Sequence, residues 1–247
     1  MTVIRLLLAY DGTSFRGWAR QPRVRTVQGV IEEALGRMLG EVPKPSVAGR
    51  TDAGVHALGQ VASFVAPGGA DPERIQRGLN GILGPEVVVR EAAVAPDRFN
   101  ARHSATGREY VYRIRTALVP DPFTARFVWH HPGALRMVPM RRASRLLTGE
   151  HDFASFCRAP RTPASTVRRL RRLAVATSHE EVTIRAMADS FLHQMVRSIV
   201  GTLVAVGEDR IEPEAMPGIL AGRDRSAAGQ IAPSHGLTLV RVIYGRR

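Results

Sequence analysis

Helix-like and strand-like segments mix along this chain without the strict alternation of a doubly wound α/β protein. Short apolar or alternating runs, typical of strands, are separated by segments whose apolar residues recur at helical spacing. This irregular order favours an α+β fold with an antiparallel or mixed sheet, because a parallel sheet needs a long crossover between its strands. A chain of 247 residues is long enough to bury a substantial core in that fold.

Capping and turn residues set the expected limits of the elements. An apolar run at residues 3–10 ends at the turn signal Asp11-Gly12 and predicts a buried strand. Thr26 and Gly40 enclose one predicted helix, and Asp71 before Pro72 opens a second that runs to about residue 83. The other expected strands are 46–48, 60–66, 87–94, 109–116, 166–177, 181–189 and 237–244, and the other expected helices are 138–147, 190–206 and 213–220.

The chain is expected to divide into two halves, residues 1–100 and 101–247, which meet near residues 96–104. Each half mixes strands with helices, and no low-complexity linker separates them. Two packed halves would form a cleft, and clefts between such parts are common places for functional sites. We therefore expect residues of both halves to contribute to one site.

The charge balance points to a polyanionic partner. The formal net charge is +13, and Lys44 is the only lysine among 35 basic residues. Guanidinium groups fork onto phosphate and stack on bases, so nucleic acid is the first partner to consider. Nucleotide bias of the coding genome would explain much of the preference for arginine, but not the excess over acids. The densest run, RRLRR at residues 168–172, is either a solvated edge or a strip that contacts RNA.

Several classes of site are missing from the sequence. Cys157 is the only cysteine, which excludes an intramolecular disulfide and a metal site made of cysteines, and fits a reducing cytosol. No segment is long and apolar enough to span a bilayer, so the expected location is the cytoplasm. The sequence has no GxxxxGK[ST] loop, no GxGxxG after a strand and no HExxH. An enzyme with this sequence is expected to work without a nucleotide cofactor or a metal.

Residues 48–57, AGRTDAGVHA, form the segment with the clearest chemical content. Asp52 supplies a carboxylate and Arg50 a planar cation, and the glycines at 49 and 54 allow tight turns and close approach of another molecule. A surface turn with a local Arg–Asp pair is the commoner explanation of a bare G-x-x-D-x-G. The alternative is a site in which Asp52 is the nucleophile or base.

Two further residues are candidates for the same site. Arg197 lies inside the apolar helical run FLHQMVRSIVGTLVAV, where an unpaired cation would be costly to bury, so we expect an acidic partner. That pair is either purely structural or part of a site. Tyr110 shares a strand face with Tyr112 and lies near arginines, so it either packs in the core or stacks on an unstacked base.

Seven ordered segments of the chain resemble the bacterial tRNA pseudouridine synthase A family. They are YDGTSFRGW, TVQGVIEEAL, AGRTDAGVHALGQVASF, REYVYRI, HDFASF, MVRSIVG and GLTLVRVIY. The resemblance covers nearly the whole chain, and GRTDAGVHA is its most specific motif. It implies an isomerase that converts uridine to pseudouridine in the tRNA anticodon stem-loop, at positions 38, 39 and 40, without a cofactor. The implied enzyme is a homodimer with RNA lying across both subunits.

The resemblance also implies roles for individual residues. Asp52 matches the catalytic aspartate, which either adds to the base or promotes a glycal-type elimination; the sequence leaves both open. Arg197 matches the arginine that pairs with this aspartate, and Tyr110 matches the residue that stacks on the target base. Arg50 matches an arginine that can fill the space vacated by a flipped uridine. Leu237 and Leu239 are expected as apolar walls of the base pocket.

The implied fold is that of pseudouridine synthases, with two similar α/β halves that share a mostly antiparallel central sheet and a basic cleft between them. Three residues depart from the family pattern: Ala19, Asn100 and Ser198 replace residues that are frequent there. Two other functions stay open on the residues alone. A silent RNA-binding protein would explain the charge but not Asp52 among glycines, and a hydrolase of nucleosides or sugars would usually need a second acid or a metal.

Overall fold

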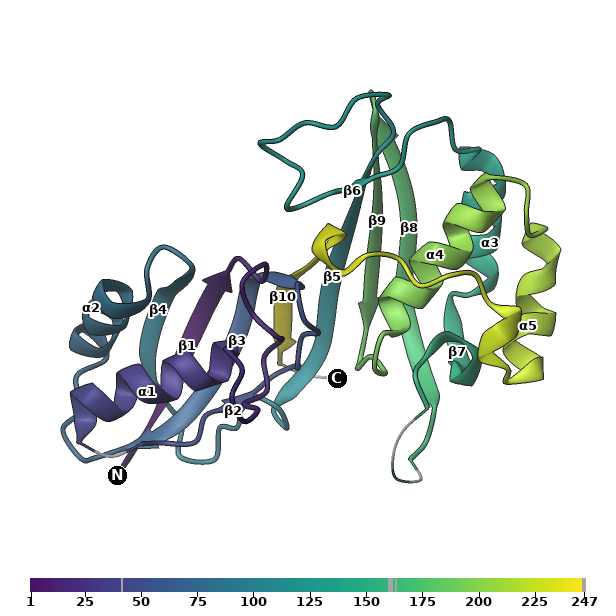
Figure 1. Ribbon diagram of the computed structural model, residues 1–247. Coiled ribbons are helices and arrows are strands. Elements are labelled where there is room, and N and C mark those ends of the chain that lie inside the picture. The colour runs from purple at the N-terminus through teal and green to yellow at the C-terminus, as the bar shows by residue number, and fades with distance from the viewer. Residues whose placement is uncertain (41, 160–161, 163, 246–247) are drawn as a thin grey trace. The chain divides into compact units, whose positions relative to one another are not determined.

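We describe the protein from a computed structural model that covers residues 1–40, 42–159, 162 and 164–245. Strands and helices follow one another in irregular order, so the expected α+β class is confirmed (Figure 1). The chain forms two compact units: the first contains Met1–Thr106 and Thr238–Arg247, and the second contains Gly107–Leu237. The last strand thus belongs almost entirely to the first unit.

The first unit is a sheet with two helices. Its strands are β1 (Thr2–Tyr10), β2 (Ser46–Val47), β3 (His56–Ala66), β4 (Val87–Ala95) and β10 (Leu237–Tyr244), and its helices are α1 (Val27–Leu39) and α2 (Pro72–Leu83). The strand order is β4-β1-β3-β10, and the short β2 lies beside β3. The β1–β3 and β1–β4 pairs are antiparallel, whereas β10 runs parallel to β3.

Alternation along β1 and the caps of both helices explain how this unit folds. Ile4, Leu6 and Leu8 alternate along β1 and are fully buried. Helices α1 and α2 lie on one face of the sheet (Figure 1). The expected caps are confirmed: the Thr26 side chain accepts a hydrogen bond from the Gly29 N–H, and Gly40 ends α1 with a φ of 76°. The Asp71 side chain likewise accepts from the Glu73 N–H at the start of α2.

The second unit combines five further strands of the sheet with three helices. Its strands are β5 (Ala105–Arg115), β6 (Trp129–His130), β7 (Gly149–Asp152), β8 (Val167–Ser178) and β9 (Glu181–Ala188), and its helices are α3 (Met137–Leu146), α4 (Met195–Gly207) and α5 (Met216–Gly222). The order is β5-β9-β8-β7, all antiparallel, and the two-residue β6 runs parallel beside β5. Tyr112 and Ile114 of β5 are two residues apart, so they share one face of the strand, and both are fully buried.

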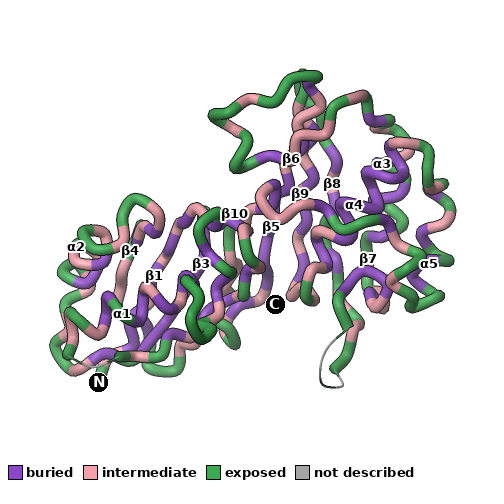
Figure 2. The backbone as a smooth tube through the Cα atoms, in the orientation of Figure 1, coloured by how far each residue is buried: buried purple, intermediate pink, exposed green. Residues whose placement is uncertain are grey.

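Helix α4 is the central helix of the second unit. Every residue of α4 is buried except Arg197 (Figure 2). The helix begins later than expected, at Met195 rather than at residue 190. Gln194 has a left-handed φ of 64°, which is incompatible with a right-handed helix and so prevents α4 from starting earlier. No helix in the described ranges is both long and apolar enough to cross a membrane.

Candidate active site

Asp52 lies in the first unit, in the loop between β2 and β3. The Val55 N–H donates to the Asp52 carbonyl at 3.1 Å, and Gly54 has a φ of 77°, so residues 52–55 form a tight turn. A positive φ at the third position of a turn favours glycine, which gives Gly54 its structural reason. The turn leaves the Asp52 residue half-buried.

Buried polar side chains brace this loop from the strands beneath it. The hydroxyl groups of Tyr10 and Thr51 are 2.8 Å apart, and Gln60 donates through Nε2 to the Gly49 carbonyl at 2.6 Å and to the Tyr10 hydroxyl at 3.3 Å. Burial raises the pKa of Tyr10 to about 12, against smaller lowering effects of its bonds with Thr51 and Gln60. Tyr10 is therefore an uncharged hydrogen-bonding partner at neutral pH.

The segment of residues 11–18 holds the same loop through main-chain contacts. The Trp18 N–H donates to the Thr51 carbonyl at 3.0 Å, and the Gly54 N–H donates to the Phe15 carbonyl at 3.3 Å. A Cβ at Gly17 would lie 2.8 Å from the Thr51 carbonyl oxygen, so only glycine permits this approach. The main chain is thus hydrogen-bonded on both sides of Asp52, and the loop has a defined path.

The other two candidates in the first unit differ in exposure. Arg50 is exposed and has no hydrogen-bond or ion-pair partner among the described residues. Leu239 is fully buried in β10, where it lies opposite Ala57, just beyond the Asp52 loop in β3. An exposed guanidinium is available to a ligand, whereas Leu239 contributes apolar surface beside the loop.

Tyr110 belongs to the second unit. It lies on β5 opposite Ala186 of β9 and is 7% exposed. Its ring meets that of Phe191 edge to face, with centroids 5.2 Å apart and planes at 89°. Nearby on the strand, Arg108 donates to the Asp189 carbonyl at 2.7 Å. Tyr110 therefore has a packed ring in a fixed orientation.

Arg197 extends from α4 and is half-buried. Its Nε donates to the Ala232 carbonyl at 2.8 Å, and the Ala232 N–H donates to the Arg197 carbonyl at 3.1 Å. This carbonyl satisfies one of the donors of the guanidinium, and a planar group fixed at Nε presents its remaining donors in set directions. The expected acidic partner stays a prediction.

The six predicted residues divide equally between the two units. Arg50, Asp52 and Leu239 belong to the first unit, whereas Tyr110, Arg197 and Leu237 belong to the second. Leu237 is buried at the start of β10. The pairing of Asp52 with Arg197 stays a prediction.

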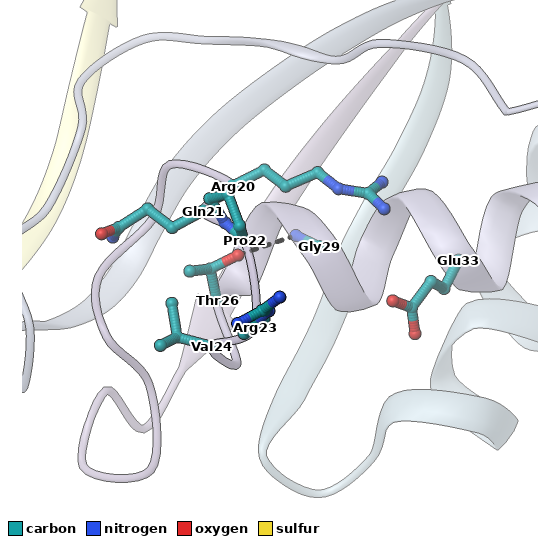
Figure 3. A pocket seen from close by; sticks show the side chains of 8 residues that line it. All are labelled: Arg20, Gln21, Pro22, Arg23, Val24, Thr26, Gly29 and Glu33. Atoms are coloured by element: carbon teal, nitrogen blue, oxygen red, sulfur yellow. Dashed lines mark hydrogen bonds between the residues drawn. The ribbon is translucent and has the colours of Figure 1, made fainter.

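A cavity of about 500 Å³ lies in the first unit beside the start of α1 (Figure 3). It is lined by Arg20, Gln21, Pro22, Arg23, Val24, Thr26, Gly29 and Glu33. Arg20 pairs with the buried Glu32 at 2.7 Å, and Arg23 is exposed. The sequence left this region open between a packed loop and an RNA contact. Trp18 is fully buried, while Arg20 and Gln21 face solvent, so the segment both packs and exposes arginine.

The three departures from the family pattern have different surroundings. The Asn100 side chain accepts from the N–H groups of Arg102 and His103 at 2.9 and 3.1 Å, so it organises its own loop. Ala19 is half-buried. The Ser198 hydroxyl is fully buried and has no hydrogen-bond partner in the part of the chain that the structure describes.

Sequence reasoning missed the groups that hold the candidates in place. Tyr10, Thr51 and Gln60 hold the Asp52 loop, and Ala232 holds Arg197. A signal did exist for Gln60, because it is a long amide in a mostly apolar strand. Within the described residues, no three His, Cys, Asp or Glu side chains are grouped so as to hold a metal ion.

Comparison with known proteins gives consistent matches over most of the chain. A family model described as tRNA pseudouridine synthase matches residues 7–104 and 143–245. A Geotalea daltonii protein named tRNA pseudouridine synthase A is 43% identical over 244 residues, which are 99% of this chain and 100% of that protein. A Moorella thermoacetica protein of the same name is 44% identical over 247 residues, which cover 99% of this chain and 100% of that protein. A Frankia casuarinae protein of the same name is 47% identical over 247 residues, which cover 98% of this chain and 89% of that protein.

Among solved structures, one chain in the crystal structure of the archaeal box H/ACA sRNP Nop10-Cbf5 complex is similar to this one. The identity is 12% and the TM-score is 0.39, over 82% of this chain and 44% of that chain.

Proposed function

This chain belongs to the tRNA pseudouridine synthase family, and from that premise we propose that it isomerises uridine to pseudouridine in tRNA. The reaction breaks the bond between N1 and C1′, turns the uracil and joins C5 to C1′. The hydrogen of C5 leaves as a proton and N1 gains one, so the atoms balance without an oxidant or a second substrate. Uridines 38, 39 and 40 of the anticodon stem-loop are the proposed targets, by resemblance to tRNA pseudouridine synthase A.

Asp52 is the proposed catalytic group, as nucleophile or base. The observation that carries this assignment is a half-buried carboxylate on a loop whose main chain is hydrogen-bonded at Gly49, Thr51 and Gly54. A reacting group gains rate from being held in one geometry, because the entropy of orientation is then lost before the reaction starts. A surface turn with no such task would not need three buried side chains to hold it.

Arg197 and Tyr110 are the proposed partners of Asp52. A guanidinium fixed through Nε can bind a carboxylate with its terminal nitrogens, which would keep Asp52 ionised and in one orientation. Tyr110 has a packed ring on β5 that can stack on the uracil. Leu237 and Leu239, both buried, are proposed as apolar walls for the base.

Arg50 is the proposed contact with the nucleic acid at the flipped position. Arg50 is exposed and stands two residues before Asp52 in the same loop, and an exposed cation beside a catalytic group can fill the space left by an extruded base. The net charge of +13 supports binding to the phosphate backbone in general. We also propose a homodimer that acts in the cytoplasm, in keeping with the family resemblance and the single cysteine.

Release of tritium tests this proposal directly. A tRNA anticodon stem-loop labelled with tritium at C5 of uridine should release the label to water with the wild-type protein. Asp52→Asn should lower that rate roughly 10⁴-fold or more, because removing a catalytic group of this kind costs several orders of magnitude. The tRNA dissociation constant should change little, since the carboxylate carries no phosphate contact.

Asp97→Asn is the matched control for the loss of one carboxylate in the first unit. Asp97 is exposed in the loop after β4 and has no hydrogen bond among the described residues. Its replacement should leave turnover and binding at wild-type values. Retained turnover in Asp52→Asn, or no tritium release by the wild type on any tRNA, would overturn the proposal.

A further inference from the structure

The segment from Gly229 to Gly236, which we call the strap, joins the last helix of the second unit to β10. In Figure 1 it is the yellow segment that crosses α4, and the hydrogen bonds of Ala232 confirm that the two lie side by side. It contains no α-helix or strand, only the short 3-10 turn Ser234–Gly236 at its end. A connection of this kind is usually mobile unless other contacts fix it.

Glycines on both sides let the strap approach α4 closely. A Cβ at Gly201 of α4 would lie 1.6 Å from the Gln230 carbonyl oxygen, and a Cβ at Gly229 would lie 2.7 Å from the Cα of Thr202. The Gly229 N–H donates to the Thr202 hydroxyl at 3.0 Å, and that hydroxyl donates to the Ser198 carbonyl at 2.9 Å. The first end of the strap is therefore fixed to the helix that carries Arg197.

The middle of the strap holds Arg197 itself. Ala232 exchanges two bonds with this residue: its N–H donates to the Arg197 carbonyl at 3.1 Å, and its carbonyl accepts from Arg197 Nε at 2.8 Å. The second bond sets the plane of the guanidinium. A displacement of the Ala232 carbonyl would turn that plane and every donor in it.

Tyr112 anchors the other end of the strap to β5. Its hydroxyl donates to the Pro233 carbonyl at 2.8 Å, one residue from Ala232, and the ring is fully buried. A Cβ at Gly236 would lie 2.6 Å from this ring, so the strap also approaches the ring closely. Burial raises the pKa of Tyr112 far above its ordinary value, against a smaller lowering by the nearby charge of Arg197, so the hydroxyl remains a donor.

We propose that Tyr112 is a positioning residue that orients the Arg197 guanidinium through the Pro233–Ala232 part of the strap. This inference rests on the proposed role of Arg197 in the isomerase reaction. It assigns the second tyrosine of the Y-x-Y pair a task beyond core packing. The hydroxyl holds one carbonyl, and the neighbouring carbonyl aims the cation.

Two matched variants separate positioning from stability. Tyr112→Phe removes a hydroxyl that donates to a backbone carbonyl at 2.8 Å, and Tyr244→Phe removes another that donates to the Ala101 carbonyl at the same distance in the first unit. Each should lower the melting temperature by a similar few degrees. Only Tyr112→Phe should lower kcat, roughly tenfold, at unchanged KM for tRNA, because misplaced catalytic groups lose rate rather than binding.

A second measurement reads the guanidinium without any turnover. The ¹⁵N signal of Arg197 Nε–H, identified by its loss in Arg197→Lys, should exchange slowly with solvent in the wild type because it is bonded to Ala232. Tyr112→Phe should accelerate that exchange, and Tyr244→Phe should leave it unchanged. Unchanged exchange and unchanged kcat in Tyr112→Phe would overturn the positioning role.

The two proposals fail in different ways. A wild type that releases no tritium overturns the isomerase, while the exchange of Arg197 Nε–H still decides whether Tyr112 orients this side chain. Thr202→Val gives an independent route, because it removes the hydroxyl that binds the Gly229 N–H and loosens the opposite end of the strap. It should shift kcat and exchange in the same direction as Tyr112→Phe, and no shift in either would count against the strap as the positioning element.

Discussion

The two units hold their candidate residues by different means. In the first unit, hydrogen bonds fix the main chain around Asp52, through the Gly49 and Thr51 carbonyls and the Gly54 N–H. In the second unit, α4 already fixes the main chain of Arg197, and the bond to Ala232 fixes the side chain instead. The protein thus restrains a loop in one case and a long side chain in the other.

The difference follows from the lengths of the two side chains. An aspartate has few rotamers, so its carboxylate is positioned once the backbone beneath it is fixed. Arginine has many rotamers even on a rigid helix, and ordering it costs up to about 2 kcal/mol of side-chain entropy. A single carbonyl on Nε removes much of that freedom. A fixed main chain therefore orients the Asp52 carboxylate, whereas Arg197 also needs a bond that fixes its guanidinium.

After Asp52→Asn, the largest effect should come from Arg197. Arg197→Leu should lower kcat roughly 10³-fold, as loss of a strong preorganised donor does, while most of the fold is preserved. Arg197→Lys should fall within about tenfold of that loss, because lysine keeps the charge but has neither Nε–H nor a planar fork. Single-turnover kinetics on tRNA would measure both.

Arg145→Leu provides the comparison, because Arg145 is an exposed arginine in the last turn of α3. Its turnover should match the wild type. Near-normal kcat in Arg197→Lys would mean that charge alone suffices and that orientation of the guanidinium is unimportant.

A smaller effect is expected where the Asp52 loop meets residues 11–18. Gly17→Ala combines a φ of 91° with a Cβ 2.8 Å from the Thr51 carbonyl, whereas Gly69→Ala has a φ of 81° and open space. Strain plus overlap should lower the free energy of unfolding by about 3 kcal/mol for Gly17→Ala, against about 1 kcal/mol for strain alone. Urea unfolding measures both, and equal losses would show that the contact with Thr51 tolerates a methyl group.

The smallest effect concerns Tyr10 at alkaline pH. Its folded pKa of about 12 lies above its ordinary value of 10, so the folded state keeps a proton that the unfolded chain loses. The resulting stability is complete below about pH 10 and disappears as the pH rises toward 12, by at most about 2–3 kcal/mol. Tyr10→Phe should remove this part of the decline in chemical unfolding curves. Parallel curves for the two proteins up to pH 12 would contradict the buried hydroxyl.

Local signals predicted much of the fold. The limits of α1, the start of α2 and the whole of β10 agree with expectation, because Thr26, Gly40 and Asp71 act on their own neighbours. The predicted start of α4 at residue 190 was wrong, because apolar spacing continues through residues 190–194. In the structure the Arg158 N–H donates to the His193 carbonyl and Gln194 has a positive φ, so the helix begins only at Met195. Such contacts depend on distant residues and leave no periodic trace.

The irregular part of β8 shows the same limit. Simple alternation places Arg169 and Arg171 on one face, but the register shifts between Leu170 and Arg172. Leu170 and Leu173, three residues apart, are both buried as a result. A bulge is set by the partner strand β9, so the pattern of β8 alone does not predict it.

The candidate site was predictable only in part. The motif GRTDAGVHA pointed to Asp52 and Arg50, a cation inside an apolar helical run pointed to Arg197, and an aromatic strand face near arginines pointed to Tyr110, while the family resemblance supplied their roles. The hydrogen bonds that hold these residues in place were not predictable, because their partners are far apart in sequence. Tyr112 and Pro233 are 121 residues apart, and Tyr10 and Thr51 are 41 residues apart. Nothing in a single sequence links such pairs.

The strap and β10 have a consequence for the order in which the protein is made. Residues 229–244 follow every other helix and strand, yet β10 pairs with β3 in the first unit and the strap aims Arg197 in the second. At roughly 5–20 residues per second, a ribosome completes Asp52, Tyr110 and Arg197 seconds before the segments that finish either unit. We expect a nascent chain to remain inactive until its last strand is in place, even among the tRNAs that surround the ribosome.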